Sequence, residues 1–408
     1  MEHLSRYVSD GFETAKNGNA NMVYQNVVKY LENGQLPLRS HYAFGWIIYY
    51  ALHQQPDSEI VERKKLLANY LRLSVAKPHK LHSMILTEAI RLYKNAKNAA
   101  YGKKGSEVQK FSIVKFSELW DLSNLRPGDK RRKEHEGKES SSTTEKLITL
   151  YIDEIENTKN QPCRKFIGVI EEALQMYPES YTLLSQQAML KALSCETEEA
   201  RNLLRKALLF APGKFFLWSR LAMLVPADEE PRRHVALLYK ALCCPGPEQF
   251  KGKIRLALAE AFIKKNQFHY AMWELDRVKQ IYESNSWHLP KAHIMASGRL
   301  PRETVASDPV ALYRKLVSLA DDEIYNALPI IKVRKTYHKN PDTDTSPRSG
   351  NRNFGKPAVV WRVTDAEGKN YWLQPHKFGI PMDLPLGTTL QIRIHGSRPV
   401  KAQLDPVV

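Results

Sequence analysis

The stretch Leu204-Arg205-Lys206-Ala207-Leu208 has a near copy on either side, Ile170-Glu171-Glu172-Ala173-Leu174 before it and Leu238-Tyr239-Lys240-Ala241-Leu242 after it. The three alanines are evenly spaced along the chain, and a proline follows each copy, at Pro178, Pro212 and Pro245. We call this spacing the repeat period. A period of about 34 residues is typical of stacked helix-turn-helix units. Because such arrays form extended binding surfaces, the pattern predicts a helical solenoid that binds a partner.

The window 181–214 resembles a tetratricopeptide (TPR) repeat in its large apolar residues, its small residues and its closing proline, which are Leu184, Ala188, Ala200, Leu204, Ala207 and Pro212. Small side chains let two helices approach closely, and a proline cannot continue a helix. The next window matches as well, although His234 stands where Ala200 stood. The resemblance implies three to four TPR-type units.

The length predicts several domains. A chain of 408 residues exceeds what one hydrophobic core usually serves. We expect an N-terminal helical region of degenerate repeats or a cap (1–125), a basic and serine-rich linker or loop (126–145), the TPR-type repeats (146–321) and a β-barrel (322–408). The fold class is therefore multi-domain α plus β.

Several features favour a cytoplasmic protein. No apolar run reaches the ~20 residues that span a bilayer, so no membrane partner is expected. The first residues lack the apolar region of a signal peptide. The four cysteines have no C-x-x-C spacing, which favours reduced packing residues.

The net charge of +17 is unevenly distributed. Residues 1–146 hold 24 Lys and Arg against 16 Asp and Glu, residues 147–327 hold 24 against 22, and residues 328–408 hold 13 against 6. The repeats are thus nearly neutral while both ends are basic, which favours local contact with a polyanion. The alternative is that net charge serves solubility alone.

A basic cluster lies in the N-terminal part, with candidate phosphate contacts at Arg91, Lys94, Lys97, Lys103 and Lys104. Lysines alone carry little specificity, so a solvated helix face is an equal interpretation.

From residue 328 onward the sequence changes to the period-two alternation of β-strands. Apolar residues alternate at Ile331/Val333, Val359/Trp361/Val363, Tyr371/Leu373, Leu390/Ile392/Ile394 and Val400/Ala402/Leu404. Five short strands separated by Gly and Pro predict a small barrel of the OB type.

The alternation also predicts which side chains lie on the outer face. With the apolar set pointing inward, the outer face collects Lys332, Arg334, Arg362, Trp372, Arg393, His395 and Lys401, and the loop 338–356 adds Arg348 and Arg352. OB folds bind single strands by stacking bases on aromatic rings while cations follow the backbone. Trp372 is the first candidate for stacking; alternatively, it covers the barrel end or docks on the repeats.

Helical repeats followed by a basic small barrel resemble the TPR proteins with a C-terminal cold-shock-like OB domain of bacterial TOTE conflict systems. The resemblance rests on the stretches Pro357-Ala358-Val359-Val360-Trp361-Arg362-Val363 and Tyr371-Trp372-Leu373. It implies a role in sensing or targeting nucleic acid during antiviral defence.

Motifs of common enzymes are missing from the sequence. It holds no Walker loop, no Gly-x-Ser-x-Gly and no His-Glu-x-x-His. We expect no catalytic residue, cofactor or metal. The function expected is a non-enzymatic adaptor that binds single-stranded RNA or DNA through the barrel and a protein through the TPR groove. The alternative is a protein–protein scaffold in which the barrel caps the repeats.

Overall fold

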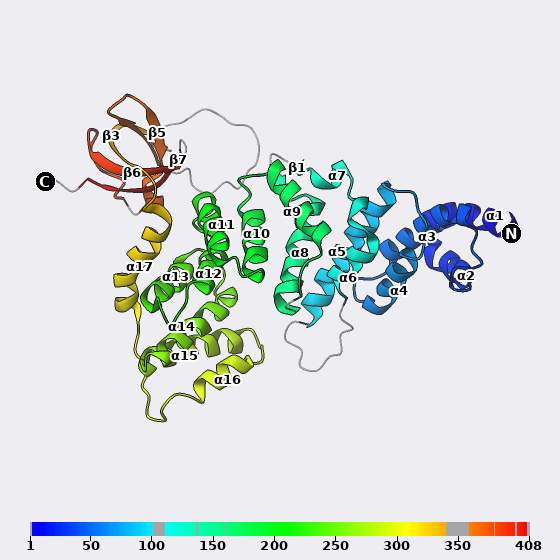
Figure 1. The fold of residues 1–408 in the computed structure, drawn as a ribbon, viewed down its shortest axis with the longest axis horizontal. Coiled ribbons are helices and arrows are strands. Elements are labelled where there is room, and N and C mark those ends of the chain that lie inside the picture. Colours follow the sequence, from blue (N-terminus) through cyan, green and yellow to red (C-terminus); the bar gives the residue numbers. More distant parts are fainter. Residues whose placement is uncertain are drawn as a thin grey trace. The chain divides into compact units, whose positions relative to one another are not determined.

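The computed structural model describes residues 2–100, 111–135, 138–158, 160–339, 359–378, 380–395 and 398–405. It is mostly helical and ends in a five-stranded antiparallel sheet, which confirms the α plus β class (Figure 1). Its helices are α1 (Glu2–Thr14), α2 (Ala20–Glu32), α3 (His41–Gln54), α4 (Ile60–Tyr70), α5 (Lys80–Ala100), α6 (Ile113–Trp120), α7 (Pro127–Lys130), α8 (Thr143–Thr158), α9 (Arg164–Met176), α10 (Tyr181–Leu193), α11 (Thr197–Phe210), α12 (Phe215–Leu224), α13 (Pro231–Cys243), α14 (Gly252–Lys264), α15 (Phe268–Ser284), α16 (Lys291–Ser297) and α17 (Val310–Tyr325). Its strands are β1 (Lys133–His135), β2 (Lys138–Ser140), β3 (Ile330–Lys339), β4 (Val360–Asp365), β5 (Asn370–Leu373), β6 (Thr389–His395) and β7 (Arg398–Leu404).

The chain divides into two compact units. The first unit comprises Met1–Ala207 and Lys279–Ile294, and the second comprises Leu208–Val278 and Met295–Val408. The unit boundaries fall inside α11, α15 and α16.

In the first unit, the aromatic helix α3 lies in the core. Phe44, Ile47 and Ile48 are fully buried, as expected for a helix that is apolar on most sides. Gly45 permits a close approach, because a Cβ atom there would lie 2.8 Å from Cδ2 of Leu81 on α5.

Where composition predicts a linker over 126–145, the described residues carry α7 and the β1–β2 hairpin. The Arg132 guanidinium lies 2.6 Å from the buried Glu145 carboxylate. Ser142 and Glu145 form a reciprocal capping box at the start of α8, since each side chain accepts a hydrogen bond from the other residue's backbone N–H. The segment is thus tied to the helix that follows it.

Helices α10 to α15 follow the repeat period. Ala188, Ala200 and Ala207 are fully buried, as close helix packing requires. In α13, His234 takes the place of a small residue. Its Nδ1 lies 2.9 Å from the carbonyl oxygen of Ala222 and 3.2 Å from that of Val225, at the end of α12. Hydrogen bonding to these terminal carbonyls accommodates the larger ring.

The C-terminal sheet lies in the second unit and has the strand order β5-β4-β3-β6-β7. Three consecutive strands pair as a meander and the fourth returns beside the first, which is a Greek-key order. The edge strands β5 and β7 contact each other, so the sheet curls into a half-barrel. Its core contains Trp361, Val363, Leu390 and Ile392, all fully buried. The five expected strands are present.

Candidate nucleic-acid interface

Three side chains form a row across the outer face of the meander. Tyr337 on β3 pairs in register with Arg362 on β4, and Arg362 pairs with Trp372 on β5. The two rings are exposed, Tyr337 at 44% and Trp372 at 60%. The Arg362 guanidinium lies 5.6 Å from the centre of the Tyr337 ring. We call Tyr337, Arg362 and Trp372 the aromatic–arginine row.

A β-bulge puts Tyr337 in this row. The pairing of β3 with β4 shifts between Lys335 and Tyr337, so Thr336 is an extra residue on β3. Strict alternation from Val333 places Tyr337 on the inner face, and the sequence therefore gives no signal for it. The Thr336 hydroxyl donates a 3.2 Å hydrogen bond to the Arg362 carbonyl, which holds the bulge against β4.

Polar side chains lie beside the row. The hydroxyl oxygens of Thr336 and Thr364 are 3.0 Å apart, and Thr364 donates a 2.8 Å hydrogen bond to the side-chain oxygen of Asn370. Arg334 is exposed one residue before the bulge on β3, opposite Thr364. The face therefore combines flat rings with cations, which is the combination by which proteins bind single strands, and adds exposed hydroxyl and amide groups.

Lys335 lies on the opposite, inner side of the sheet. Its ammonium is buried 4.0 Å from the centre of the Trp361 ring and donates to the Leu384 carbonyl oxygen at 2.5 Å. Burial lowers the pKa of Lys335 below its ordinary value. This cation belongs to the half-barrel core and not to the outer face.

Other outer-face candidates have partners away from the row. Lys332 is exposed and lies 3.3 Å from Asp405. The Arg393 Nη1 donates to the carbonyl oxygens of Tyr325 at 2.8 Å and Leu328 at 2.9 Å, at the C-terminal end of α17. Cations are favoured at that end of a helix.

The two remaining described candidates also face helices of the second unit. The His395 ring centre lies 5.2 Å from that of Phe210. The Lys401 ammonium lies 3.7 Å from the Asp321 carboxylate. Arg348 and Arg352 lie outside the described residues. The structure thus brings Arg362 and Trp372 together with Tyr337, while Arg393, His395 and Lys401 contact helices of the second unit.

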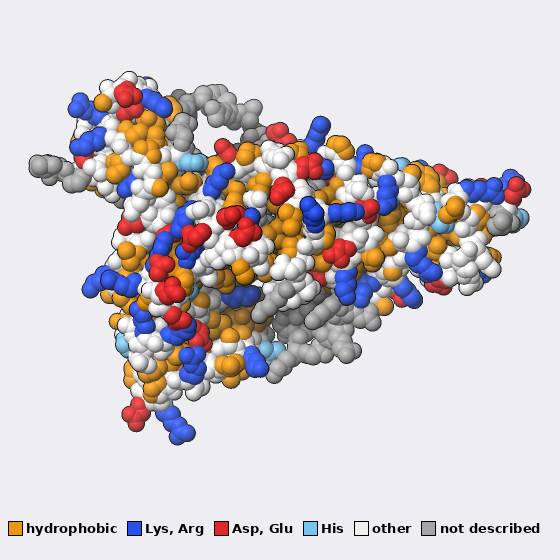
Figure 2. Space-filling model, in the orientation of Figure 1, with side chains coloured by type: hydrophobic (Ala, Val, Ile, Leu, Met, Phe, Trp, Pro, Cys, Tyr) orange, Lys and Arg blue, Asp and Glu red, His pale blue; other side chains and the backbone are white. Residues whose placement is uncertain are grey.

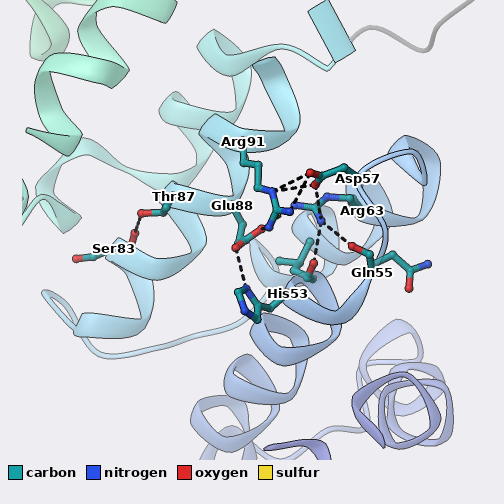
Figure 3. A network of polar contacts seen from close by, with 9 residues as sticks. His53, Gln55, Asp57, Arg63, Ser83, Thr87, Glu88 and Arg91 are labelled. Atoms are coloured by element: carbon teal, nitrogen blue, oxygen red, sulfur yellow. Dashed lines mark hydrogen bonds and ion pairs between the residues drawn. The ribbon is translucent and has the colours of Figure 1, made fainter. Parts of the chain in front are cut away.

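Two members of the basic cluster of the N-terminal part pair with carboxylates. Arg91 lies 2.8 Å from Asp57 (Figure 3). Lys97 pairs with Asp153. Lys94 is exposed on α5, while Lys103 and Lys104 lie outside the described residues.

Arg91 borders a buried network that holds three helices together. Arg63 on α4 is fully buried, and its guanidinium lies 2.6 Å from Glu88 on α5 (Figure 3). It also donates to the carbonyl oxygens of Leu52 at 2.9 Å and Gln55 at 3.0 Å, where α3 ends. These contacts of Arg63 tie α3, α4 and α5 together beside Arg91.

The two parts of the second unit differ in surface charge. On the visible face, Figure 2 shows several Lys and Arg side chains with a few acidic ones around the C-terminal sheet, and acidic and basic side chains interspersed over the helices. This distribution agrees with the near balance of residues 147–327 and the basic excess after them.

The described ranges hold neither a candidate metal cluster nor a helix that could span a membrane. No group of three or more His, Cys, Asp or Glu residues there could hold a metal ion. Every helix in that part of the chain is too short or too polar to traverse a bilayer.

Comparison with known proteins gives a family match over part of the chain. Residues 181–320 match the model of a family described as Domain of unknown function (DUF7017). The match begins at the first residue of α10 and ends within α17, so it covers helices and not the five-stranded sheet. No curated protein matches the chain.

Proposed function

We propose that the chain is a non-enzymatic cytoplasmic adaptor whose C-terminal sheet binds single-stranded RNA or DNA. The observation that carries the proposal is the aromatic–arginine row, in which two exposed rings flank a guanidinium on three adjacent strands.

The spacing of the row suits an extended strand. Neighbouring β-strands lie about 4.8 Å apart, so Tyr337 and Trp372 are two strands, or about 10 Å, from each other. Each ring offers one face to a base, while Arg362 between them meets a phosphate. Stacking of this kind tolerates any base, because every base has a π-face.

We assign the sheet to the OB type. A five-stranded, partly open Greek-key barrel is the architecture of that fold, and its nucleic-acid face lies on its second and third strands. Those strands correspond to β4 and β5, which carry Arg362 and Trp372. The support is strand order and residue placement.

We assign α10 to α15 to TPR-type repeats that bind a protein partner. Buried alanines at the repeat period and nearly balanced charge support this assignment. A neutral groove is a poor site for a polyanion and a better one for a polypeptide. Together with the resemblance to conflict-system proteins, this suggests an adaptor in prokaryotic defence.

The alternative function is a protein–protein scaffold. It is favoured by Arg393, His395 and Lys401, which join the sheet to helices of the same unit and so use part of its charge internally. Co-purification of one stoichiometric protein, unchanged by nuclease and without strand binding, would support this alternative over the first function.

The test is fluorescence anisotropy of a labelled single-stranded oligonucleotide titrated with the full chain. Loss of one stacking contact costs roughly 1–3 kcal/mol per base, so Trp372→Ala and Tyr337→Ala should each raise the Kd about 5- to 150-fold. Phe250→Ala is the matched control, because Phe250 is 55% exposed in the short helix Glu248–Phe250 and lies outside the sheet. Equal affinity of all four proteins would refute the assignment of the row.

A further inference from the structure

A cavity of about 630 Å³ lies within the second unit. One wall comes from the helices α13 and α17, and the other comes from the sheet. Among the residues that line it are Lys240, Asp321, Tyr325, Trp372, Pro399 and Lys401. Its volume falls within the range of about 300–1,000 Å³ that holds small ligands.

Two ammonium groups in this cavity share one carboxylate. The Lys240 Nζ lies 2.7 Å from Asp321 Oδ1, and the Lys401 Nζ lies 3.7 Å from Asp321 Oδ2. All three side chains are half-buried, at 26%, 29% and 22% exposure for Lys240, Lys401 and Asp321. The cluster therefore has an excess positive charge in a partly desolvated place, where an anion is bound more strongly than at the surface.

Aromatic rings complete the lining. Trp372, the exposed end of the aromatic–arginine row, is also a wall residue of the cavity. The buried Tyr325 ring lies beneath Lys401, with 5.8 Å between the ammonium and the ring centre. One tryptophan thus borders both the outer face and the positively charged cavity.

We propose that this cavity holds the phosphorylated end of the bound single strand. The terminal phosphate contacts Lys240 and Lys401, and the terminal base stacks on Trp372. The proposal rests on the proposed function, because the strand reaches the cavity from the aromatic–arginine row.

The difference in negative charge explains why a terminal phosphate is favoured over an internal phosphate. A phosphate monoester carries about −1.5 to −2 charge at pH 7, whereas an internal diester carries one negative charge. Only the monoester carries more negative charge than the Asp321 carboxylate, which already pairs with Lys240 and Lys401. The cavity volume of about 630 Å³ lies in the range of small-ligand sites and is large enough for a terminal nucleotide.

The experiment compares oligonucleotides of one sequence with a 5′-phosphate, a 3′-phosphate or no terminal phosphate, each titrated with the full chain. One of the phosphorylated ends is expected to bind about tenfold more tightly than the unphosphorylated strand. Lys401→Gln should abolish this advantage. Asp321→Asn should increase it, because it frees both lysines from their competing carboxylate. Lys332→Gln is the control, since Lys332 is a cation of the same sheet outside the cavity lining.

The outcomes separate the two proposals. Equal affinity for all three oligonucleotides, with Trp372 and Tyr337 still required, would overturn the end-binding site and leave the proposed function standing. Lys401-dependent binding of a nucleoside monophosphate without binding of any strand would support the cavity as a phosphate site and refute the strand-binding function. A loss of the phosphate advantage in Asp321→Asn would also contradict the proposal.

Discussion

At the scale of single residues, the surroundings of three arginines differ and decide what each arginine does. Arg63 is buried between a carboxylate and the end of α3. Arg393 donates to the last carbonyls of α17. Arg362 lies between two exposed rings. Arg63 and Arg393 satisfy helix carbonyls that lack an intrahelical partner, whereas we propose that Arg362 binds an external ligand.

The buried pair of the first unit is expected to be sensitive to the loss of one partner. Glu88→Gln removes the carboxylate that lies 2.6 Å from the buried Arg63 guanidinium and leaves only the half-exposed Asp57, 3.5 Å away; breaking a buried pair costs roughly 3–5 kcal/mol. Chemical denaturation should report this loss in the first unit. Glu62→Gln, which removes an exposed carboxylate 3.6 Å from Lys65, is expected to change stability by less than about 0.5 kcal/mol. Comparable effects of the two variants would contradict the structural role of the network.

Residue placement was predictable where alternation is regular and not where it is interrupted. Trp372 faces outward because Tyr371 and Leu373 face the core, and the sequence predicts this. Tyr337 was missed because one extra residue on β3 reverses its face. The partners of Arg393 and Lys401 were also missed, since they come from α17, far away along the sequence.

At the scale of elements, α17 joins the helices of the second unit to the half-barrel. Its last turn accepts the Arg393 hydrogen bonds, and Asp321 on it pairs with Lys240 of α13. The repeat period predicted the helices of the array, but the period ends before α17. Within 126–145, where composition predicts a linker or loop, Arg132 pairs with Glu145, a contact that composition does not predict.

Arg393→Met should weaken the attachment of the half-barrel to α17. A cation at a helix C-terminus contributes up to about 2 kcal/mol in partly buried geometries. Hydrogen exchange should accelerate at the end of α17 and at the start of β3, while affinity for a single strand changes little. A loss of affinity as large as that of Trp372→Ala would show that Arg393 belongs to the binding face.

His234 on α13 predicts a pH dependence of stability. Burial lowers its pKa below the ordinary value of 6.5, so the folded chain disfavours the charged ring. Its stabilising contribution is present above pH 6.5 and is lost as pH falls towards the lower folded pKa, because the unfolded chain then binds the proton more readily. The thermal unfolding temperature should fall as the pH is lowered from 7.5 to 5.5, and it should fall less steeply in His234→Asn. An identical pH profile in that variant would refute this cause.

At the scale of the whole molecule, the excess positive charge per residue is highest in the part of the chain where strand binding is proposed. Residues 328–408 hold 13 Lys and Arg against 6 Asp and Glu, while residues 147–327 are nearly balanced. In the N-terminal part, individual cations of the basic cluster pair with carboxylates, as Arg91 and Lys97 illustrate. Composition predicted the location of the charge, but only the contacts separate paired cations from available ones.

Salt dependence should distinguish the two kinds of contact in the row. For single strands, the logarithm of the affinity falls with the logarithm of salt concentration by about 0.7 for each neutralised phosphate. Arg362→Gln is therefore expected to reduce the slope by about 0.7, whereas Trp372→Leu lowers affinity and leaves the slope unchanged. A steeper slope in Arg362→Gln, or a changed slope in Trp372→Leu, would contradict these roles.

The most direct test of the central claim is photo-crosslinking of a 4-thiouridine-containing single strand to the full chain, followed by peptide mass spectrometry. The account predicts adducts on β3 and β5, at Tyr337 and Trp372, and their loss when unlabelled strand competes. Adducts confined to helices α10 to α14, with none on the sheet, would contradict it.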